Sequence, residues 1–257
     1  MSEAVIGKLA KALRAGGAHS AWVGINDSQV AEALAREDFD AVTLDMQHGS
    51  YDQVGAARAI LSVALAGKPT VVRIPVGDFA AASRLIDAGA AGVIAPMINS
   101  LADARAFADF MKFPPLGRRS WGPRACGPLS GFAGPAYLHE ANAITLAIAM
   151  IETREALAAL DDILGVDGID GVFVGPSDLS IALAGGGVVD PHGPAVAEAL
   201  AKVVAAAQRR GKFVGLFCFT GADAKAARAR GIAFTSISTD SLLLRAAARA
   251  ELEKARG

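Results

Sequence analysis

The sequence is poor in cysteine and has no long apolar run. Its two cysteines, Cys126 and Cys218, lie far apart and form no C-x-x-C pair, so we expect reduced thiols rather than a disulfide or a cysteine-based metal site. A membrane-spanning helix needs about 20 consecutive apolar residues, and the chain has no such stretch. The first residues, Met1–Arg14, lack a secretory signal pattern and read as an amphipathic helix. These absences predict a cytoplasmic protein.

A net charge of either sign is also missing. Lys and Arg number 25 against 26 Asp and Glu, which gives a formal net charge of −1. We therefore expect neither nucleic acid nor an anionic membrane as the main partner, and expect a small molecule instead. Hydrophobic residues make up 53% of the 257 residues, and the mean hydropathy is +0.37. That composition is sufficient for a large core.

Short apolar runs alternate with helical patterns along the whole chain. The runs are rich in Val, Ile and Phe and nearly continuous in apolar character, which is typical of parallel strands covered on both faces. We expect strands at Ala21–Asn26, Ala41–Gln47, Thr70–Pro75, Gly92–Ile98, Leu146–Thr153, Gly171–Pro176, Phe213–Phe219 and Phe234–Thr239. We expect helices at Ser28–Glu37, Asp52–Leu65, Asp78–Ala88, Ala102–Met111, Arg154–Leu164, Ala195–Arg210, Ala222–Arg230 and Leu242–Ala255.

Eight similar units favour one α/β domain over residues 1–257, a (β/α)8 TIM barrel. A doubly wound open sheet also alternates, but the first βα turn has no G-x-G-x-x-G fingerprint. Two segments rich in Gly and Pro, Phe113–Pro135 and Ala184–Pro194, are expected to be loops.

Polar side chains gather where the expected strands end. The carboxyl ends of the strands carry the active site in barrels of this type. We therefore expect one polar rim at that face, built from Asp45, Gln47, His48, Arg73, Glu152 and Asp178.

Arg73, in "VVRIP", places a guanidinium inside an apolar strand. A desolvated cation needs a partner, so a structural ion pair is one interpretation. The other is a clamp for a carboxylate or a developing oxyanion.

Glu152 and Asp178 come from neighbouring strand ends, and two carboxylates suit Mg²⁺ or Mn²⁺. Both also precede helical stretches, where acids serve as N-caps. We favour the metal site for the pair.

His48 follows Asp45 and Gln47 at the rim, so we favour a general base over a core histidine. Asp87, in the last turn of a helix, opposes the helix dipole and is a candidate partner that orients His48. His19, His139 and His192 are left as ordinary loop or helix-start residues.

The motifs "DAVTLDMQHGSYD", "VVRIP", "LIDAGAAGVIAPMINS", "FPPLGRRSWGP", "AMIET" and "GIDGVFVGPSDLS" occur in that order. Together they resemble the HpcH/HpaI family of metal-dependent (class II) 2-oxo-acid aldolases, over about Trp22–Thr239. The resemblance implies a phosphoenolpyruvate/pyruvate-type barrel and an aldehyde-lyase. Such an enzyme cleaves a 4-hydroxy-2-oxo acid to an aldehyde and pyruvate, or a related donor such as hydroxypyruvate.

The resemblance also implies roles for individual residues. Glu152 and Asp178 hold the divalent metal (Mg²⁺ or Mn²⁺, with Co²⁺ or Zn²⁺ as alternatives). Arg73 stabilises the enolate, His48 with Asp87 moves the proton, and Asp45 belongs to the catalytic set. The N–H groups of Ser177 and Asp178 bind the substrate carboxylate, as helix N-termini do. The loop Gly117–Arg124 covers the site and offers Arg118, Arg119 or Arg124 to the substrate.

Gln47 departs from the family pattern, because many relatives carry Glu at that position. We expect Gln47 in the substrate site, where a glutamine can hold a water molecule but cannot accept its proton. The metal affinity and the preferred 2-oxo-acid donor are therefore left open. No lysine stands at a strand end, which disfavours a Schiff-base mechanism.

Three rivals remain. A citrate lyase β-subunit or malyl-CoA lyase relative would use the same carboxylates, but it needs a CoA site, usually with extra C-terminal sequence. A phosphate-binding isomerase would need glycine-rich loops after the last two strands, where the chain has "FTGADA" and "STDSLL". A non-catalytic barrel would not need the polar rim. Relatives form trimers or hexamers with exchanged C-terminal helices, so we expect a homo-oligomer.

Overall fold

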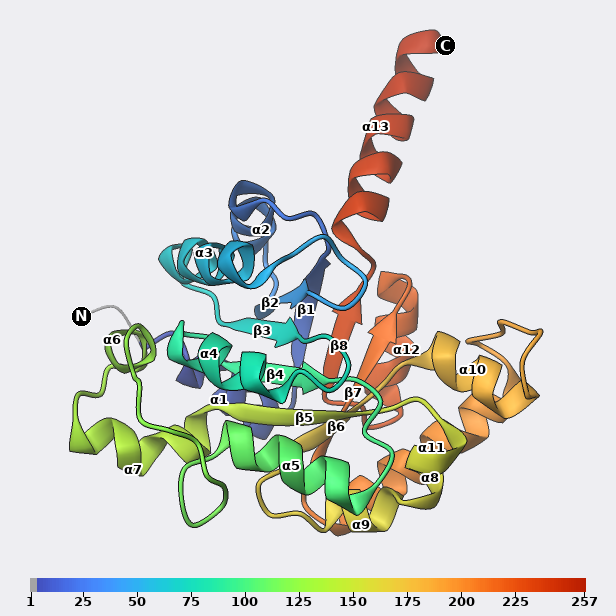
Figure 1. Cartoon of the computed structure of the whole chain (residues 1–257). Helices are drawn as coiled ribbons and strands as arrows, with labels where there is room; N and C mark the ends of the chain where they lie inside the picture. The colour runs from blue at the N-terminus through green and yellow to red at the C-terminus, as the bar shows by residue number, and fades with distance from the viewer. Residues whose placement is uncertain (1–3) are drawn as a thin grey trace.

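The computed structural model describes residues 4–257. Its eight strands close into a barrel in which each strand pairs with the next in the chain, and β8 pairs with β1 (Figure 1). All of these pairings are parallel. The strands are β1 (Ala18–Val23), β2 (Ala41–Asp45), β3 (Thr70–Arg73), β4 (Gly92–Ala95), β5 (Leu146–Ile151), β6 (Gly171–Val174), β7 (Phe213–Cys218) and β8 (Phe234–Ile237). The expected (β/α)8 barrel and all eight expected strands are confirmed.

Helices surround the barrel in the order that the sequence predicts. They are α1 (Gly7–Ala15), α2 (Ser28–Ala35), α3 (Gln53–Leu65), α4 (Phe79–Asp87), α5 (Leu101–Met111), α6 (Cys126–Ser130), α7 (Pro135–Ile144), α8 (Arg154–Ala158), α9 (Leu160–Leu164), α10 (Pro176–Ala184), α11 (Pro194–Arg209), α12 (Gly221–Ala229) and α13 (Asp240–Arg256). The amphipathic helix expected at the N-terminus corresponds to α1; residues 1–3 lie outside the described part.

One expected loop and one expected helix are wrong in part. The segment Phe113–Pro135 is not entirely loop, because α6 forms within it and α7 begins at its last residue. Proline at the first position of a helix loses no hydrogen bond and has a suitable φ, so Pro135 starts α7 rather than ending a loop. The single helix expected over Arg154–Leu164 is divided at Ala159 into α8 and α9.

The core consists of two layers separated by the barrel wall. Side chains on the outer face of the strands pack against the helices, as Val42, Val72 and Val172 do. Side chains on the inner face, including Val71 and Phe173, fill the barrel. Because the interior is filled, a ligand can reach only the two ends of the barrel.

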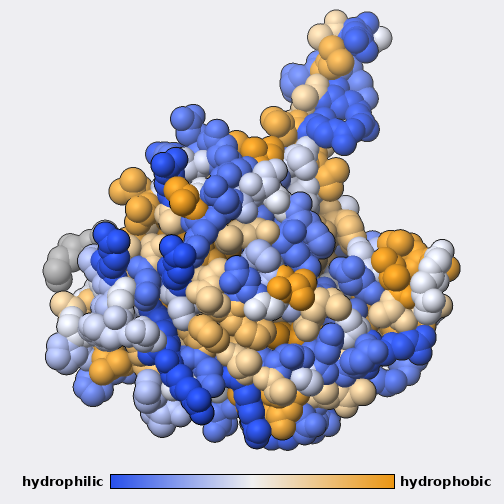
Figure 2. Space-filling model, in the orientation of Figure 1, coloured by the Kyte–Doolittle hydropathy of each residue, from blue (hydrophilic) through white to orange (hydrophobic). Residues whose placement is uncertain are grey.

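Helix α13 projects away from the barrel (Figure 1). Asp240 at its base is its buried residue, while Leu242 and Leu244 are 47% and 64% exposed. Figure 2 shows a mostly hydrophilic surface toward the end of this helix, with hydrophobic residues near its base. Within residues 4–257, no helix combines the length and the apolar character that crossing a bilayer requires.

Candidate active site

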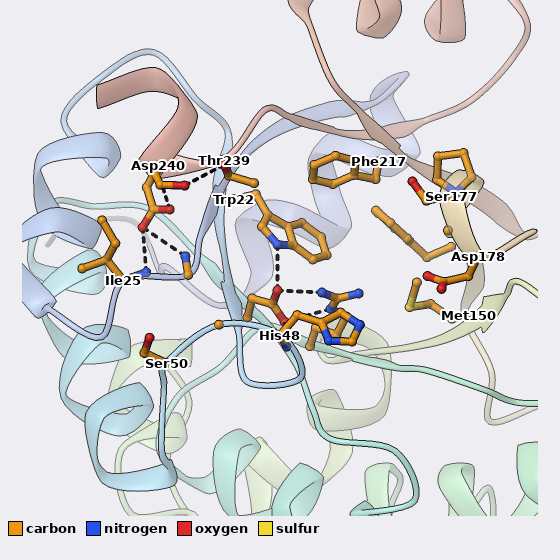
Figure 3. Close-up of a pocket in the computed structure, with 18 residues that line it drawn as sticks. Trp22, Ile25, His48, Ser50, Met150, Ser177, Asp178, Phe217, Thr239 and Asp240 are labelled. Atoms are coloured by element: carbon orange, nitrogen blue, oxygen red, sulfur yellow. Dashed lines mark hydrogen bonds and ion pairs between the residues drawn. The ribbon is translucent and has the colours of Figure 1, made fainter. Parts of the chain in front are cut away.

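A cavity of about 520 Å³ opens at the carboxyl ends of the strands (Figure 3). Five of the predicted residues line it: Asp45, His48, Arg73, Ser177 and Asp178. Six of the eight strand ends contribute, together with the start of α13. The additional lining residues are Trp22, Gly24, Ile25, Gly49, Ser50, Met150, Phe173, Gly175, Pro176, Phe217, Thr239, Asp240 and Ser241.

Asp45 and Arg73 form a buried ion pair at the base of this cavity. They are register partners on β2 and β3. The Nε and Nη2 atoms of Arg73 donate to the two carboxylate oxygens of Asp45 at 2.9 and 2.6 Å. Both residues are buried. The structural ion pair weighed from the sequence is therefore present, and the partner of Arg73 is Asp45.

The ion pair still leaves part of the guanidinium available. Within residues 4–257, Nη1 of Arg73 makes no hydrogen bond, and Arg73 lines the cavity. The guanidinium lies over the ring of Trp22, 4.9 Å from its centroid, and the Trp22 indole donates to Asp45 at 3.2 Å. Trp22 and Asp45 thus fix the orientation of Arg73, whose remaining N–H groups can meet a ligand oxygen.

The environment of Asp45 favours the carboxylate form. Burial alone would raise the pKa of Asp45, but the hydrogen bonds and charge of Arg73 outweigh it, with further donation from the His48 backbone and Trp22. The net effect lowers the pKa of Asp45 below its ordinary value. Asp45 is therefore held as the ionised partner of Arg73.

His48 is held by its backbone rather than by its side chain. The N–H groups of Gln47 and His48 donate to Oδ1 of Asp45 at 3.0 and 3.2 Å. The His48 side chain is exposed and lines the cavity. The alternative of a core histidine satisfied by a backbone carbonyl is therefore excluded.

The structure does not bring Asp87 to His48. Asp87 pairs instead with the buried Arg119, whose Nη2 lies 2.5 Å from Oδ1. No hydrogen bond or ion pair joins Asp87 to His48 within residues 4–257, and Asp87 does not line the cavity. The sequence could not show this competition, because Arg119 comes from a loop 32 residues away. The expected contact between Asp87 and His48 is therefore absent within one chain, and Arg119 pairs with Asp87.

Glu152 does not line the cavity but lies behind Gly175, and its charge interacts with that of Asp178. Glu152 is 2% exposed, and its Oε1 accepts the N–H of Met97 at 2.9 Å. Burial, together with the charge of Asp178, raises the pKa of Glu152 to about 7 even though the Met97 N–H opposes the shift. Two carboxylates therefore repel each other at this position.

Neither carboxylate is used as a helix N-cap. The N-caps of α8 and α10 are Thr153 and Gly175, and Asp178 stands in the first turn of α10. In the described residues, the side chain of Asp178 accepts no hydrogen bond. Among the same residues, no three or more His, Cys, Asp or Glu side chains are grouped so that they could hold a metal ion. Oxygen ligands from two acids with open positions fit a hard divalent cation, which would also relieve their repulsion.

Three predicted substrate residues, Ser177, Asp178 and Gln47, differ in placement. Ser177 and Asp178 present backbone N–H groups at the start of α10 that have no acceptor within residues 4–257. Gln47 does not line the cavity, and its side-chain oxygen is buried without a partner. Gln47 therefore lies behind the rim rather than in contact with the cavity.

Gly175 allows Glu152 to occupy its position. A Cβ on Gly175 would lie 2.6 Å from Oε2 of Glu152 and 2.8 Å from the Met150 side chain. We expect Gly175→Ala to displace the Glu152 carboxylate and to weaken Mn²⁺ binding about tenfold or more, measured by calorimetry. The matched control is Gly221→Ala, where an added Cβ meets nothing within 4 Å. Equal Mn²⁺ affinity in the two variants would contradict this placement of the metal site.

A family model described as HpcH/HpaI aldolase/citrate lyase matches residues 19–247. The chain belongs to this family. It is 43% identical to the hydroxypyruvate/pyruvate aldolase of Rhizorhabdus wittichii, over 91% of this chain and 92% of that protein. It is 33% identical to the 4-hydroxy-2-oxo-heptane-1,7-dioate aldolase of Salmonella arizonae, over 89% and 86%.

Solved structures agree with this assignment. An HpcH/HpaI aldolase/citrate lyase family protein from Burkholderia cenocepacia superimposes with a TM-score of 0.86 at 30% identity, over 98% of this chain and all of that one. Membership of the family and of its enzyme class, the lyases, confirms the expectation from the motifs.

Sequence reasoning missed several residues of the site. Trp22 and Phe217 were predicted only as strand residues, and Asp240 only as the end of "STD". Apolar side chains, and an acid in the first turn of a helix, give no local signal of a site. They could have been found only by asking which side chains of each strand point into the barrel.

Proposed function

We propose that this HpcH/HpaI family member is a metal-dependent aldolase that reversibly cleaves a 4-hydroxy-2-oxo acid to an aldehyde and pyruvate or hydroxypyruvate. The observation that carries the proposal is the oriented guanidinium of Arg73. Asp45 and Trp22 hold it at the base of the cavity with Nη1 unused. A retro-aldol step develops negative charge on the 2-oxo oxygen, and a fixed donor there stabilises that charge in the transition state.

Glu152 and Asp178 would hold a divalent metal, with Mg²⁺ or Mn²⁺ favoured. When bound, such an ion supplies a Lewis acid that accepts charge from the 2-oxo group. Met97 contributes by donating its N–H to one oxygen of Glu152, which leaves Oε2 available. The left-handed backbone of Met97, with φ of +56°, directs that N–H.

His48 would exchange the proton of the C4 hydroxyl. Its exposed ring on the cavity wall can reach a ligand without any change of the turn that carries it. The unused N–H groups of Ser177 and Asp178 would receive the substrate carboxylate at the positive end of α10. Substrate would therefore lie between α10 and the His48 turn.

We also propose that the enzyme acts in the cytoplasm as a homo-oligomer, a trimer or hexamer. The exposed leucines near the base of α13 support subunit contacts through this helix. If Asp87 orients His48, the Asp87 of one subunit would have to contact the His48 of another subunit.

The reaction class is tested by product release. The chain should release pyruvate from a racemic 4-hydroxy-2-oxo acid, followed with a coupled dehydrogenase, and should release no acetyl-CoA from malyl-CoA or citryl-CoA. Release of acetyl-CoA from these CoA esters, with the 4-hydroxy-2-oxo acid left intact, would assign the chain to the citrate lyase branch of the family. The proposed function would then be wrong.

A further inference from the structure

Asp240 is a buried carboxylate on the side of the cavity opposite to Asp178 (Figure 3). It is the first residue of α13 and is 4% exposed. Its Oδ2 accepts the backbone N–H groups of Gly24 at 3.0 Å and Ile25 at 2.8 Å. Its Oδ1 accepts the N–H of Ser241 at 2.7 Å. Asp240 therefore joins the end of β1 to the base of α13.

This carboxylate is bound only by neutral donors. Within residues 4–257, no Lys, Arg or His side chain forms an ion pair with Asp240. Burying a charge is costly, and its hydrogen bonds to N–H groups are correspondingly stronger and more directional than those of a neutral acceptor. The result is a rigid attachment for Gly24 and Ile25.

The backbone of Gly24 contacts the turn of residues 46–50, which carries His48. The N–H of Ser50 donates to the carbonyl oxygen of Gly24 at 2.8 Å. Gly49 approaches so closely that a Cβ there would lie 2.9 Å from Cα of Gly24 and 2.2 Å from the carbonyl oxygen of Asp45. The two backbone segments are therefore in direct contact over Gly49 and Ser50.

The His48 turn is thus held from two directions. Asp45 holds it from the side of Arg73, through the N–H of His48. Gly24 holds it from the other side, and Gly24 is fixed by Asp240. The His48 side chain makes no hydrogen bond of its own in the described residues, so its position depends on these two backbone supports.

We propose that Asp240 is a positioning residue for His48, acting through Gly24 and the Gly49–Ser50 turn. The inference rests on the proposed function, in which His48 moves the proton of the C4 hydroxyl. A displacement of about 1 Å at a reacting group can lower a rate about 100-fold. Loosening the turn should therefore lower kcat while leaving KM for the 2-oxo acid nearly unchanged, because Arg73 and α10 are untouched.

The test compares Asp240→Ala and Asp240→Asn in the full-length enzyme. We expect Asp240→Ala to lower kcat about 10- to 100-fold, and Asp240→Asn to lose less, since its amide oxygen can still accept from Gly24. In a His48→Ala background, Asp240→Ala should cause almost no further loss. The control is Asp223→Ala, which removes the capping box of the neighbouring α12 and touches neither Gly24 nor His48; its kcat should not change.

A second readout is independent of activity. Hydrogen–deuterium exchange of residues 46–52 should be faster in Asp240→Ala than in the wild type and in Asp223→Ala. Unchanged exchange of this segment, or an equal loss of kcat with and without His48, would overturn the proposal. If the wild-type enzyme cleaves no 4-hydroxy-2-oxo acid, the proposed function fails, while exchange still decides whether Asp240 holds the turn.

Discussion

Replacing Arg73 with alanine is expected to lower kcat for cleavage of a 4-hydroxy-2-oxo acid about 10²–10³-fold, the usual effect of removing one oxyanion donor. The variant loses the guanidinium at the cavity wall, including the N–H groups of Nη1 that Asp45 does not use. Arg73→Lys should recover little of the rate, because an ammonium group cannot bind Asp45 through two donors and also keep a third directed at the enolate. Steady-state kinetics at saturating metal measure both effects.

The same substitution should also destabilise the protein by about 3–5 kcal/mol, because it leaves Asp45 as a buried charge without its partner. The Asp45–Arg73 pair stabilises the wild type fully at pH values above the ordinary pKa of an aspartate. This stabilisation is lost as the pH falls through the lowered pKa of Asp45. Denaturant unfolding at neutral pH measures the difference. Arg36→Ala, which removes an exposed pair with Glu32, is the control and should cost at most about 1 kcal/mol.

For the kinetic prediction, a wild-type kcat in Arg73→Ala would show that Arg73 takes no part in the mechanism.

Replacing Glu152 with glutamine should have a comparably large effect through the metal. Mutating a residue that only hydrogen-bonds to a metal ligand already weakens metal affinity about 10–100-fold. Loss of a charged ligand itself should therefore weaken Mn²⁺ binding more than about 100-fold. The control is Glu155→Gln, an exposed acid three residues further on in α8. Calorimetric titration with Mn²⁺ compares them. If the two variants bind Mn²⁺ equally, Glu152 is not a ligand.

The fold could be predicted from the sequence because the barrel is built from a repeated pattern. A buried parallel strand such as "AVTLD" is apolar on both faces, and this pattern recurs eight times. The helix starts predicted at Asp52 and Asp78 follow from side-chain caps that the sequence displays. The short α6 has no such side-chain cap and no long apolar period, so it could not be seen.

The candidate site was predicted where residues follow strands and missed where partners come from distant loops. Strand ends at one face of the barrel brought His48, Arg73 and Asp178 to one cavity. The contact of Asp87 with Arg119 depends on how the loop after α5 folds back, which no local pattern encodes. The contact of Asp240 with Gly24 depends on barrel closure, because β8 and β1 meet only in three dimensions.

In the proposed function, a divalent metal ion and Arg73 would stabilise the enolate, and no lysine imine would form. The most direct test is pyruvate release from a 4-hydroxy-2-oxo acid after treatment with EDTA, followed by addition of Mg²⁺ or Mn²⁺. We predict that release stops with EDTA and returns with the metal, and that borohydride added with pyruvate leaves the enzyme active. Release that continues in EDTA, together with inactivation by borohydride and pyruvate, would contradict the claim and point to a lysine.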